Sequence, residues 1–231
     1  MNTHKAIFCW SGGKDSSLAL HRVLKVASFQ VVALLTTLNQ THRRISMHGT
    51  REELLDQQAA AIGLPLTKVW VSEGSNDEYE RKMEEELTRF KNEGVTHVIF
   101  GDIFLEDLRT YRENNLSKVG LEAHFPLWKE DTHELINEFW RSGFETITCC
   151  VSTKYLNKNF VGRKVDSSFI TELPTGVDVC GENGEFHTFC YKGPIFKQPV
   201  SFTLKEKVFK PITEYGMEGK DGFWFIDLVP E

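Results

Sequence analysis

Short apolar runs alternate with amphipathic stretches along the first half of the chain. The apolar runs lie at residues 6–10, 30–38, 66–71, 95–100 and 121–125, each short enough for a strand. The run over 30–38 is nearly continuous in apolar and β-branched residues, which is typical of a parallel strand buried on both faces. Between the runs, apolar residues recur at helical spacing, as at Leu20, Val23 and Leu24. This alternation predicts an α/β fold, a mostly parallel sheet with helices on both faces.

Local signals predict where several of these helices begin and end. Thr50, followed by Glu53 three residues later, has the spacing of a capping box, so we expect Thr50 to be the N-cap of a helix. Its pattern stops at Gly63, with a proline two residues beyond. An acidic helix is expected to end at Gly94, and another to cover about 105–119.

The pattern changes after Pro126. A helical pattern over 132–142 and an apolar run over 144–151 are followed by about thirty residues without clear periodicity. Two β-type runs, 200–209 and 223–229, complete the chain. We therefore expect two domains: residues 1–125, and a smaller α+β domain over residues 126–231.

Composition and charge narrow the classes of function. The chain has 231 residues, of which 40% are hydrophobic, and it contains no apolar stretch long enough to cross a bilayer and no signal peptide pattern. We therefore expect a cytoplasmic protein without a membrane partner. The net charge of −6 disfavours a nucleic-acid partner. The five cysteines include no Cys-x-x-Cys pair, which argues against disulfides, a zinc site and paired-cysteine sulfur transfer.

The segment Ser11-Gly12-Gly13-Lys14-Asp15-Ser16 joins the first predicted strand to the first predicted helix. Such a turn directs free backbone N–H groups and the positive end of the helix dipole to one point, which favours a bound anion. The glycines allow a phosphate to approach closely, and Lys14 adds a positive charge at a turn position that we expect to be exposed. Asp15 could hold Mg²⁺ or orient the lysine. The spacing is not that of a Walker loop, and the alternative is a purely structural turn.

Other polar residues fall at the ends of predicted strands. Ligands of parallel sheets bind at the carboxyl ends of the strands. Ser11, Thr36, His48 and Asp102 lie at or just beyond such ends, and Gly101 immediately precedes Asp102. These residues are therefore expected to line one site.

A second motif is Gly181-Glu182-Asn183-Gly184-Glu185-Phe186-His187-Thr188. If Glu185 and His187 lie on a strand, their side chains point to the same face. Carboxylates facing a cleft could bind an ammonium ion, take a proton from attacking ammonia, or hold a metal. The alternative is an Asn-Gly hairpin with solvated glutamates, and this motif alone leaves both readings open.

Together the two motifs indicate a known family. The first resembles the pyrophosphate-binding loop of the PP-loop ATP pyrophosphatases, and the pair resembles the diphthine–ammonia ligase family. The further matching segments are Met47-His48, Gln57-Gln58-Ala59, Gly63-Leu64-Pro65-Leu66, Pro126-Leu127-Trp128 and Gly162-Arg163 with Asp166. Asn183 and His187 stand where the family usually has Gly and Glu, and residues 105–112 also differ, which indicates a bacterial-type member.

The resemblance implies a HUP-type PP-loop domain followed by a small C-terminal domain. It also implies a ligase that uses ATP to adenylate a carboxylate, transfers ammonia to it, and releases AMP and pyrophosphate. In the namesake reaction the carboxylate is that of diphthine, a modified histidine of elongation factor 2. The expected partners are ATP with Mg²⁺, free ammonium, and a carboxylate on a small molecule or a modified protein side chain. A homodimer is left open.

The resemblance also assigns roles to residues. Ser11, Gly12, Gly13, Lys14, Asp15 and Ser16 are expected to bind the phosphates, and Thr36, His48, Gly101 and Asp102 to complete the nucleotide site. The catalytic candidates are Lys14, Asp15, Glu182 and Glu185, with the two glutamates on the acceptor side and Asp15 as the metal ligand. His48 and His187 are weaker acceptor-side candidates.

Three alternatives share the same ATP-binding loop. They are a PP-loop enzyme of corrinoid salvage, a tRNA-modifying enzyme, and a non-catalytic ATP-binding regulator. The acidic charge and the absence of a cysteine pair count against tRNA thiolation. The intact Lys14-Asp15 pair and the intact glutamate pair would be unnecessary in a regulator.

Overall fold

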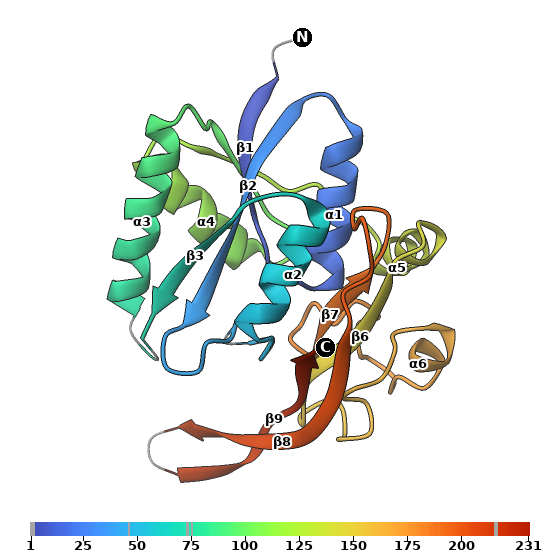
Figure 1. Cartoon of the computed structure of the whole chain (residues 1–231). Helices are drawn as coiled ribbons and strands as arrows, with labels where there is room; N and C mark the ends of the chain where they lie inside the picture. The colour runs from blue at the N-terminus through green and yellow to red at the C-terminus, as the bar shows by residue number, and fades with distance from the viewer. Residues whose placement is uncertain (1–2, 46, 73, 75, 215–216) are drawn as a thin grey trace.

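The computed structural model describes residues 3–45, 47–72, 74, 76–214 and 217–231, and it contains two sheets (Figure 1). The first half of the chain forms a five-stranded sheet with the strand order β3-β2-β1-β4-β5. All four neighbouring strand pairs are parallel. The strands are β1 (His4–Cys9), β2 (Phe29–Asn39), β3 (Leu66–Val71), β4 (His97–Ile99) and β5 (Glu122–His124).

Helices cover both faces of this sheet, as the alternating pattern predicts. They are α1 (Lys14–Lys25), α2 (Glu52–Ile62), α3 (Asn76–Asn92) and α4 (Glu106–Lys118). Ile7 of β1 packs in one core with Leu87 of α3 and Leu116 of α4. The next residue, Phe8, belongs to a second core with residues of α1 and α2. Figure 1 shows α3 and α4 on one side of the sheet and α1 and α2 on the other.

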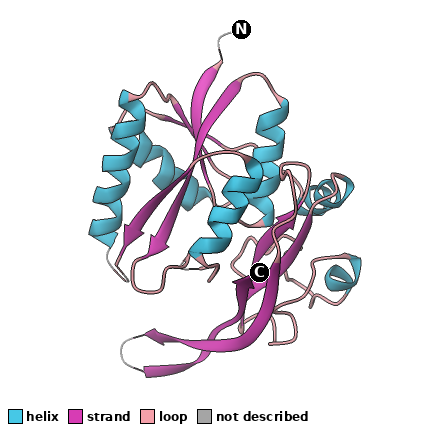
Figure 2. Ribbon diagram, viewed as in Figure 1, coloured by secondary structure: helices cyan, strands magenta, loops and turns pink. Residues whose placement is uncertain are grey.

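The second half of the chain forms a four-stranded antiparallel sheet with the order β7-β6-β9-β8. Its elements are α5 (Thr132–Arg141), β6 (Glu145–Ser152), α6 (Ser167–Thr171), β7 (Phe186–Lys192), β8 (Phe202–Glu214) and β9 (Met217–Pro230). The last two strands are longer than the apolar runs predict, because they pair with each other far along their lengths. Figure 2 shows this pair extending beyond the rest of the antiparallel sheet.

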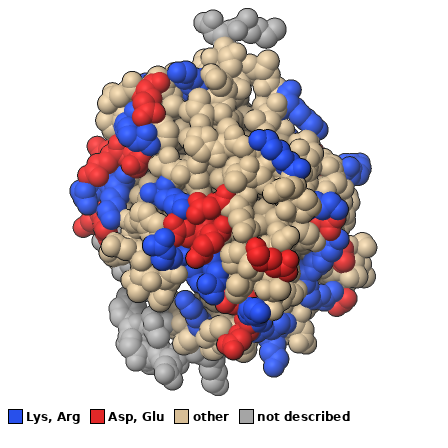
Figure 3. All heavy atoms as spheres, viewed as in Figure 1, with Lys and Arg blue, Asp and Glu red and all other residues tan. Residues whose placement is uncertain are grey.

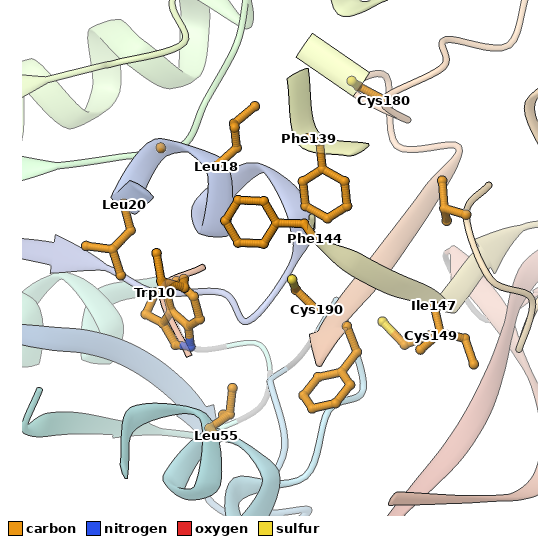
Figure 4. Packing of buried hydrophobic residues seen from close by; sticks show 14 of the residues in the cluster. Trp10, Leu18, Leu20, Leu55, Phe139, Phe144, Ile147, Cys149, Cys180 and Cys190 are labelled. Atoms are coloured by element: carbon orange, nitrogen blue, oxygen red, sulfur yellow. The ribbon is translucent and has the colours of Figure 1, made fainter. Parts of the chain in front are cut away.

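One apolar core joins the two sheets. Trp10 and Leu18, which flank the loop after β1, belong to the same buried cluster as Phe139, Phe144 and Cys190 from the second half (Figure 4). The loop itself is tied across this core, because the Cys190 N–H donates to the Gly12 carbonyl oxygen over 2.8 Å. The position of the loop therefore depends on both sheets. The division at residue 125 stays a proposal.

The predicted capping box is wrong. The helix α2 begins at Glu52, with Arg51 as its N-cap and no side-chain cap hydrogen bond. Glu52 is buried and forms ion pairs with Arg43 and with Lys68, whose Nζ lies 2.7 Å from Glu52 Oε1. These tertiary ion pairs hold the first turn of the helix, so a local capping signal is not needed there.

All five cysteines are free, and four of them are buried. Figure 3 shows basic and acidic side chains interspersed over one face of the molecule. Within the described ranges, none of the helices has the length and apolar character that a membrane crossing requires.

Candidate active site

The loop Ser11–Ser16 follows β1 and includes the first three residues of α1, at the carboxyl end of the central strand of the parallel sheet. Gly13 is the N-cap of α1, and its carbonyl oxygen accepts from the Ser17 N–H over 3.1 Å. The Ser11 hydroxyl accepts from the Gly13 N–H over 3.2 Å. The start of the helix therefore presents its positive end to the space above the sheet, which suits an anion.

Two glycines are required here by close packing. A Cβ on Gly101 would lie 2.9 Å from the backbone nitrogen of Ser16, so only glycine lets the segment after β4 pack against the loop. Gly12 has φ +77°, and a Cβ there would lie 2.7 Å from Gln58 Oε1. The loop is thus packed tightly between the end of β4 and the helix α2.

Gln58 of α2 anchors the loop, a role that the sequence did not reveal. It is fully buried, and its Nε2 donates to the carbonyl oxygens of Gly12 (3.0 Å) and Cys190 (2.6 Å). Its Oε1 accepts from the indole N–H of Trp10 over 2.9 Å. Gln58 matches a family segment, but only the fold brings it to the loop, 46 residues away in sequence.

Lys14 is buried, so the expectation of an exposed turn position is wrong. Its side chain is only 3% exposed, and its Nζ donates to both carboxylate oxygens of Asp15 (2.6 and 2.7 Å) and to the Cys180 carbonyl oxygen. Its backbone N–H donates to Thr188 Oγ1 over 3.0 Å. Burial disfavours the charged ammonium, but the charges of Asp15 and Glu182 more than compensate and raise the pKa of Lys14. The charged ammonium form is therefore favoured.

A cleft of about 1020 Å³ opens at the carboxyl ends of the parallel strands and faces the segment before β7. Its lining includes most of the residues that the sequence nominates: Ser11, Lys14, Asp15, Ser16, Thr36, His48, Gly101, Asp102, Glu182 and His187. Gly12, Gly13 and Glu185 do not line it. Thr36 lies within β2, three residues before the strand ends at Asn39.

Glu182 extends into this cleft from the second motif. Its Oε1 accepts a hydrogen bond from the Ile103 N–H over 2.9 Å, which fixes the carboxylate beside the segment after β4. Burial, together with the negative charge of Asp15, raises the pKa of Glu182 to about 7. A carboxylate that titrates near neutral pH can accept and release a proton under working conditions.

Glu185 is fully buried and lies outside the cleft. Its carboxylate accepts from the backbone N–H groups of Asp178 (3.0 Å) and Asn183 (2.8 Å), and from Asn183 Nδ2 (3.1 Å). It precedes β7, so it does not share a strand face with His187, and the described chain has no strand before the turn to form a hairpin. The carboxylate is used to hold the loop that carries Glu182. Its catalytic role stays a prediction.

Replacing Glu185 with glutamine should destabilise the protein. In the wild type, backbone N–H groups donate to the Glu185 carboxylate. The amide N–H of glutamine would face one of these donors, so at least one charge-assisted hydrogen bond, worth about 1.5–3 kcal/mol, is lost. Urea denaturation of Glu185→Gln and wild type measures the difference. Equal free energies of unfolding would contradict the structural role. Glu172→Gln, on an exposed glutamate bonded to Arg163, is the matched control, and we expect a smaller effect there.

Two imidazoles lie beside the loop. The rings of His48 and His187 are 4.6 Å apart, centroid to centroid, and are inclined by 30°. His48 Nδ1 lies 3.2 Å from the Thr188 carbonyl oxygen. Burial lowers the pKa of His48 to about 4, and burial with the nearby His48 lowers that of His187 to about 3. Both imidazoles are therefore neutral at pH 7 in the free protein.

Asp15, the predicted Mg²⁺ ligand, has both carboxylate oxygens within 2.7 Å of Lys14 Nζ. No cluster of three or more His, Cys, Asp or Glu side chains in the described ranges is arranged to hold a metal ion. Mg²⁺ commonly takes only one or two protein carboxylates, together with substrate phosphates. Asp15, which lines the cleft, would therefore hold as a single carboxylate a metal that arrives with a nucleotide.

The parallel sheet, the glycine-rich loop after its central strand and the facing acidic motif define an α/β protein of the PP-loop type. The comparison with family models then identifies the family. Residues 4–123 match the diphthamide synthase N-terminal domain, and residues 131–218 match the diphthamide synthase C-terminal domain. The chain belongs to the diphthamide synthase family. Its placement in a bacterial branch stays a prediction.

Individual relatives agree with the family models. The chain is 28% identical over 230 residues to a diphthine–ammonia ligase of Danio rerio, with 86% of each chain covered. It is 27% identical over 222 residues to that of Homo sapiens, with 86% of this chain and 82% of the relative covered. The similarity therefore extends over both sheets.

Two solved structures are similar to part of the chain. One is a predicted subunit of tRNA methyltransferase from Methanocaldococcus jannaschii, with a TM-score of 0.40, 14% identity, and 64% of this chain and 79% of that chain covered. The other is the U34-tRNA thiolase NcsA from Methanococcus maripaludis, with a TM-score of 0.37, 17% identity, and 61% of this chain and 58% of that chain covered.

Proposed function

We propose that this protein is an ATP-dependent ligase that activates a substrate carboxylate as its adenylate and transfers ammonia to it. The products are an amide, AMP and pyrophosphate. The observation that carries the proposal is that the loop with Lys14 and the carboxylate of Glu182, with its pKa of about 7, line one cleft. The relatives named diphthine–ammonia ligase support the same class of reaction.

The nucleotide binds with its β and γ phosphates at the loop. The start of α1 supplies backbone N–H groups, and Lys14 supplies a positive charge. The three N–H groups of Lys14 Nζ are used by Asp15 and Cys180, so Lys14 exchanges one carboxylate oxygen for a phosphate oxygen when ATP binds. Mg²⁺, held by Asp15, would neutralise part of the phosphate charge. Thr36, on β2, faces the adenosine.

Glu182 acts on the acceptor side. After the carboxylate oxygen attacks the α phosphate and pyrophosphate leaves, ammonia attacks the carbonyl carbon of the adenylate and must lose a proton. Glu182 takes this proton, because its pKa of about 7 leaves a large ionised fraction at neutral pH. The Ile103 N–H keeps one oxygen in place, so the other is free to face the nitrogen.

Amide formation on a defined acceptor tests this proposal. The purified protein is incubated with ATP, Mg²⁺, ammonium and elongation factor 2 that bears diphthine, and the factor is analysed by mass spectrometry. The expected result is conversion of the carboxylate to the amide, and no change in a factor that lacks diphthine. Release of pyrophosphate without amide formation would contradict the ligase proposal. Amide formation on a small carboxylic acid alone would keep the reaction and change the acceptor.

The alternatives remain a PP-loop enzyme of corrinoid salvage, a tRNA-modifying enzyme and a regulator that binds ATP without turnover. The mixed charges in Figure 3 give little support to a nucleic-acid partner on that face. The pKa of Glu182 favours an enzyme over a regulator, because binding alone needs no proton acceptor. The cytoplasmic location and the homodimer stay predictions.

A further inference from the structure

We infer that His48 takes up a proton when a polyphosphate binds at the loop, so that nucleotide binding and the protonation of one imidazole form a single coupled event. The inference rests on the proposed function, because it requires the phosphates of ATP at the loop. It gives His48 a defined chemical state in the complex and gives His187 a positioning role.

The hydrogen bond of His48 determines which nitrogen carries the proton. His48 Nδ1 contacts the carbonyl oxygen of Thr188 over 3.2 Å, and a carbonyl oxygen can only accept, so Nδ1 carries hydrogen. In a neutral imidazole the second nitrogen, Nε2, then carries a lone pair and no hydrogen. A lone pair repels a phosphate oxygen. Only the protonated ring can hold Thr188 and donate to a phosphate at the same time.

The ring is placed where it would meet a bound phosphate. His48 Cε1, which lies between the two ring nitrogens, is 3.1 Å from the position of a Cβ on Gly13. This edge of the ring therefore lies beside the N-cap of α1, where an anion is favoured. Thr188 fixes both partners, since its carbonyl oxygen holds His48 and its hydroxyl accepts from the Lys14 N–H.

His187 limits the uptake to one proton. Its ring lies against that of His48, and its Nε2 is buried without a hydrogen-bond partner in the described part of the chain. Two cationic rings with centroids 4.6 Å apart would repel each other, so the pair holds a single added charge. The neutral His187 packs against His48 and orients it toward the loop.

The surrounding charges explain why the proton arrives with the ligand. The charged and titratable groups that line the cleft with His48 are Cys9 on β1, Lys14 and Asp15 from α1, Tyr79 from α3, Asp102 after β4, Arg112 from α4, Cys180 and Glu182 before β7, and His187 on β7. In the free protein, burial lowers the pKa of His48, and Lys14 lowers it further. A polyphosphate brings several negative charges to the same place, and a nearby opposite charge favours the charged form of the imidazole.

Calorimetry with a non-cleavable nucleotide tests the inference. The intact protein is titrated with α,β-methylene-ATP and Mg²⁺ near pH 6.5 in two buffers of different ionisation enthalpy, which gives the number of protons taken up. Two variants distinguish the roles of the two ring nitrogens of His48. His48→Gln places an amide N–H near the Nε2 position without a titrating group, and His48→Asn keeps a donor for Thr188 but loses the contact with phosphate. We expect the wild type to take up about half a proton or more beyond the count for His48→Gln.

The variants should also separate affinity from its pH dependence. His48→Gln should lose the gain in affinity that the wild type shows at low pH, and His48→Asn should bind about tenfold more weakly than the wild type near pH 6. Nitrogen-15 NMR of labelled histidine in the wild-type complex should show both nitrogens of His48 protonated.

The possible results are distinguishable. Binding with equal proton counts in wild type and His48→Gln, or a His48 Nε2 that stays unprotonated in the complex, would overturn the inference and leave the proposed ligase intact. Failure of the wild type to bind α,β-methylene-ATP would instead refute the proposed function, and the inference with it.

Discussion

Lys14→Met should lower ATP turnover about 10- to 100-fold, because a charge-assisted hydrogen bond to phosphate contributes about 1.5–3 kcal/mol. Methionine keeps the apolar length of the side chain in its buried position and removes only the charge and the three donors. Pyrophosphate release at saturating ATP measures the effect. Undiminished turnover in a well-folded Lys14→Met protein would remove the loop from the mechanism.

Folding must be measured in the same variant, because Lys14 is also a structural residue. Its loss leaves the Asp15 carboxylate and the Cys180 carbonyl oxygen without their common donor. We therefore expect Lys14→Met to unfold at a lower urea concentration than the wild type. The double variant Lys14→Met/Asp15→Asn removes both charges and should recover part of this stability without recovering turnover. The double variant therefore distinguishes the destabilisation caused by an unpaired buried charge from the loss of ATP turnover.

Glu182→Gln should lower amide formation about 100-fold or more, the usual range for the loss of a general base. Adenylate formation and ATP affinity should change little. The wild-type rate, divided by the concentration of un-ionised ammonia, should rise with pH and level off above about 7, because the base works only when ionised. This rise should be absent from the variant.

Two further measurements, of ATP affinity and of stability, test this role of Glu182. A loss of ATP affinity equal to the loss of amide would contradict the assignment and place Glu182 on the nucleotide side. Stability gives an independent check on its pKa. Because the folded-state pKa is raised, the stability that the protonated form contributes is complete below the ordinary pKa of glutamate and is lost as the pH rises through about 7. Glu182→Gln should not show this loss in urea denaturation.

Most of the fold follows from local patterns. Apolar runs and helical spacing located the parallel strands and their helices, because a strand buried on both faces must be apolar along its length. The capping box predicted at Thr50 is wrong, because the start of α2 depends on contacts outside the helix rather than on a local sequence pattern. The start of α2 is stabilised by ion pairs of Glu52 with Arg43 and Lys68, which come from a preceding loop and a neighbouring strand.

The sequence predicted which residues line the site better than it predicted the role of each residue. The rule that ligands bind at the carboxyl ends of parallel strands brought Ser11, Asp102 and His48 together, and they line one cleft. Burial could not be predicted, because it depends on partners distant in sequence: the Cys180 carbonyl that accepts from Lys14 is 166 residues away. Glu182 and Glu185 look equivalent in the motif. Only the structure distinguishes the cleft residue from the one that holds the loop.

The central claim is that ATP is cleaved between its α and β phosphates at the loop. A phosphorus-31 NMR spectrum of the wild-type protein after turnover with ATP, Mg²⁺, ammonium and diphthine-bearing elongation factor 2 tests it most directly. We expect AMP and pyrophosphate in equal amounts, with the same yield of amide. ADP and inorganic phosphate as the first products would contradict it.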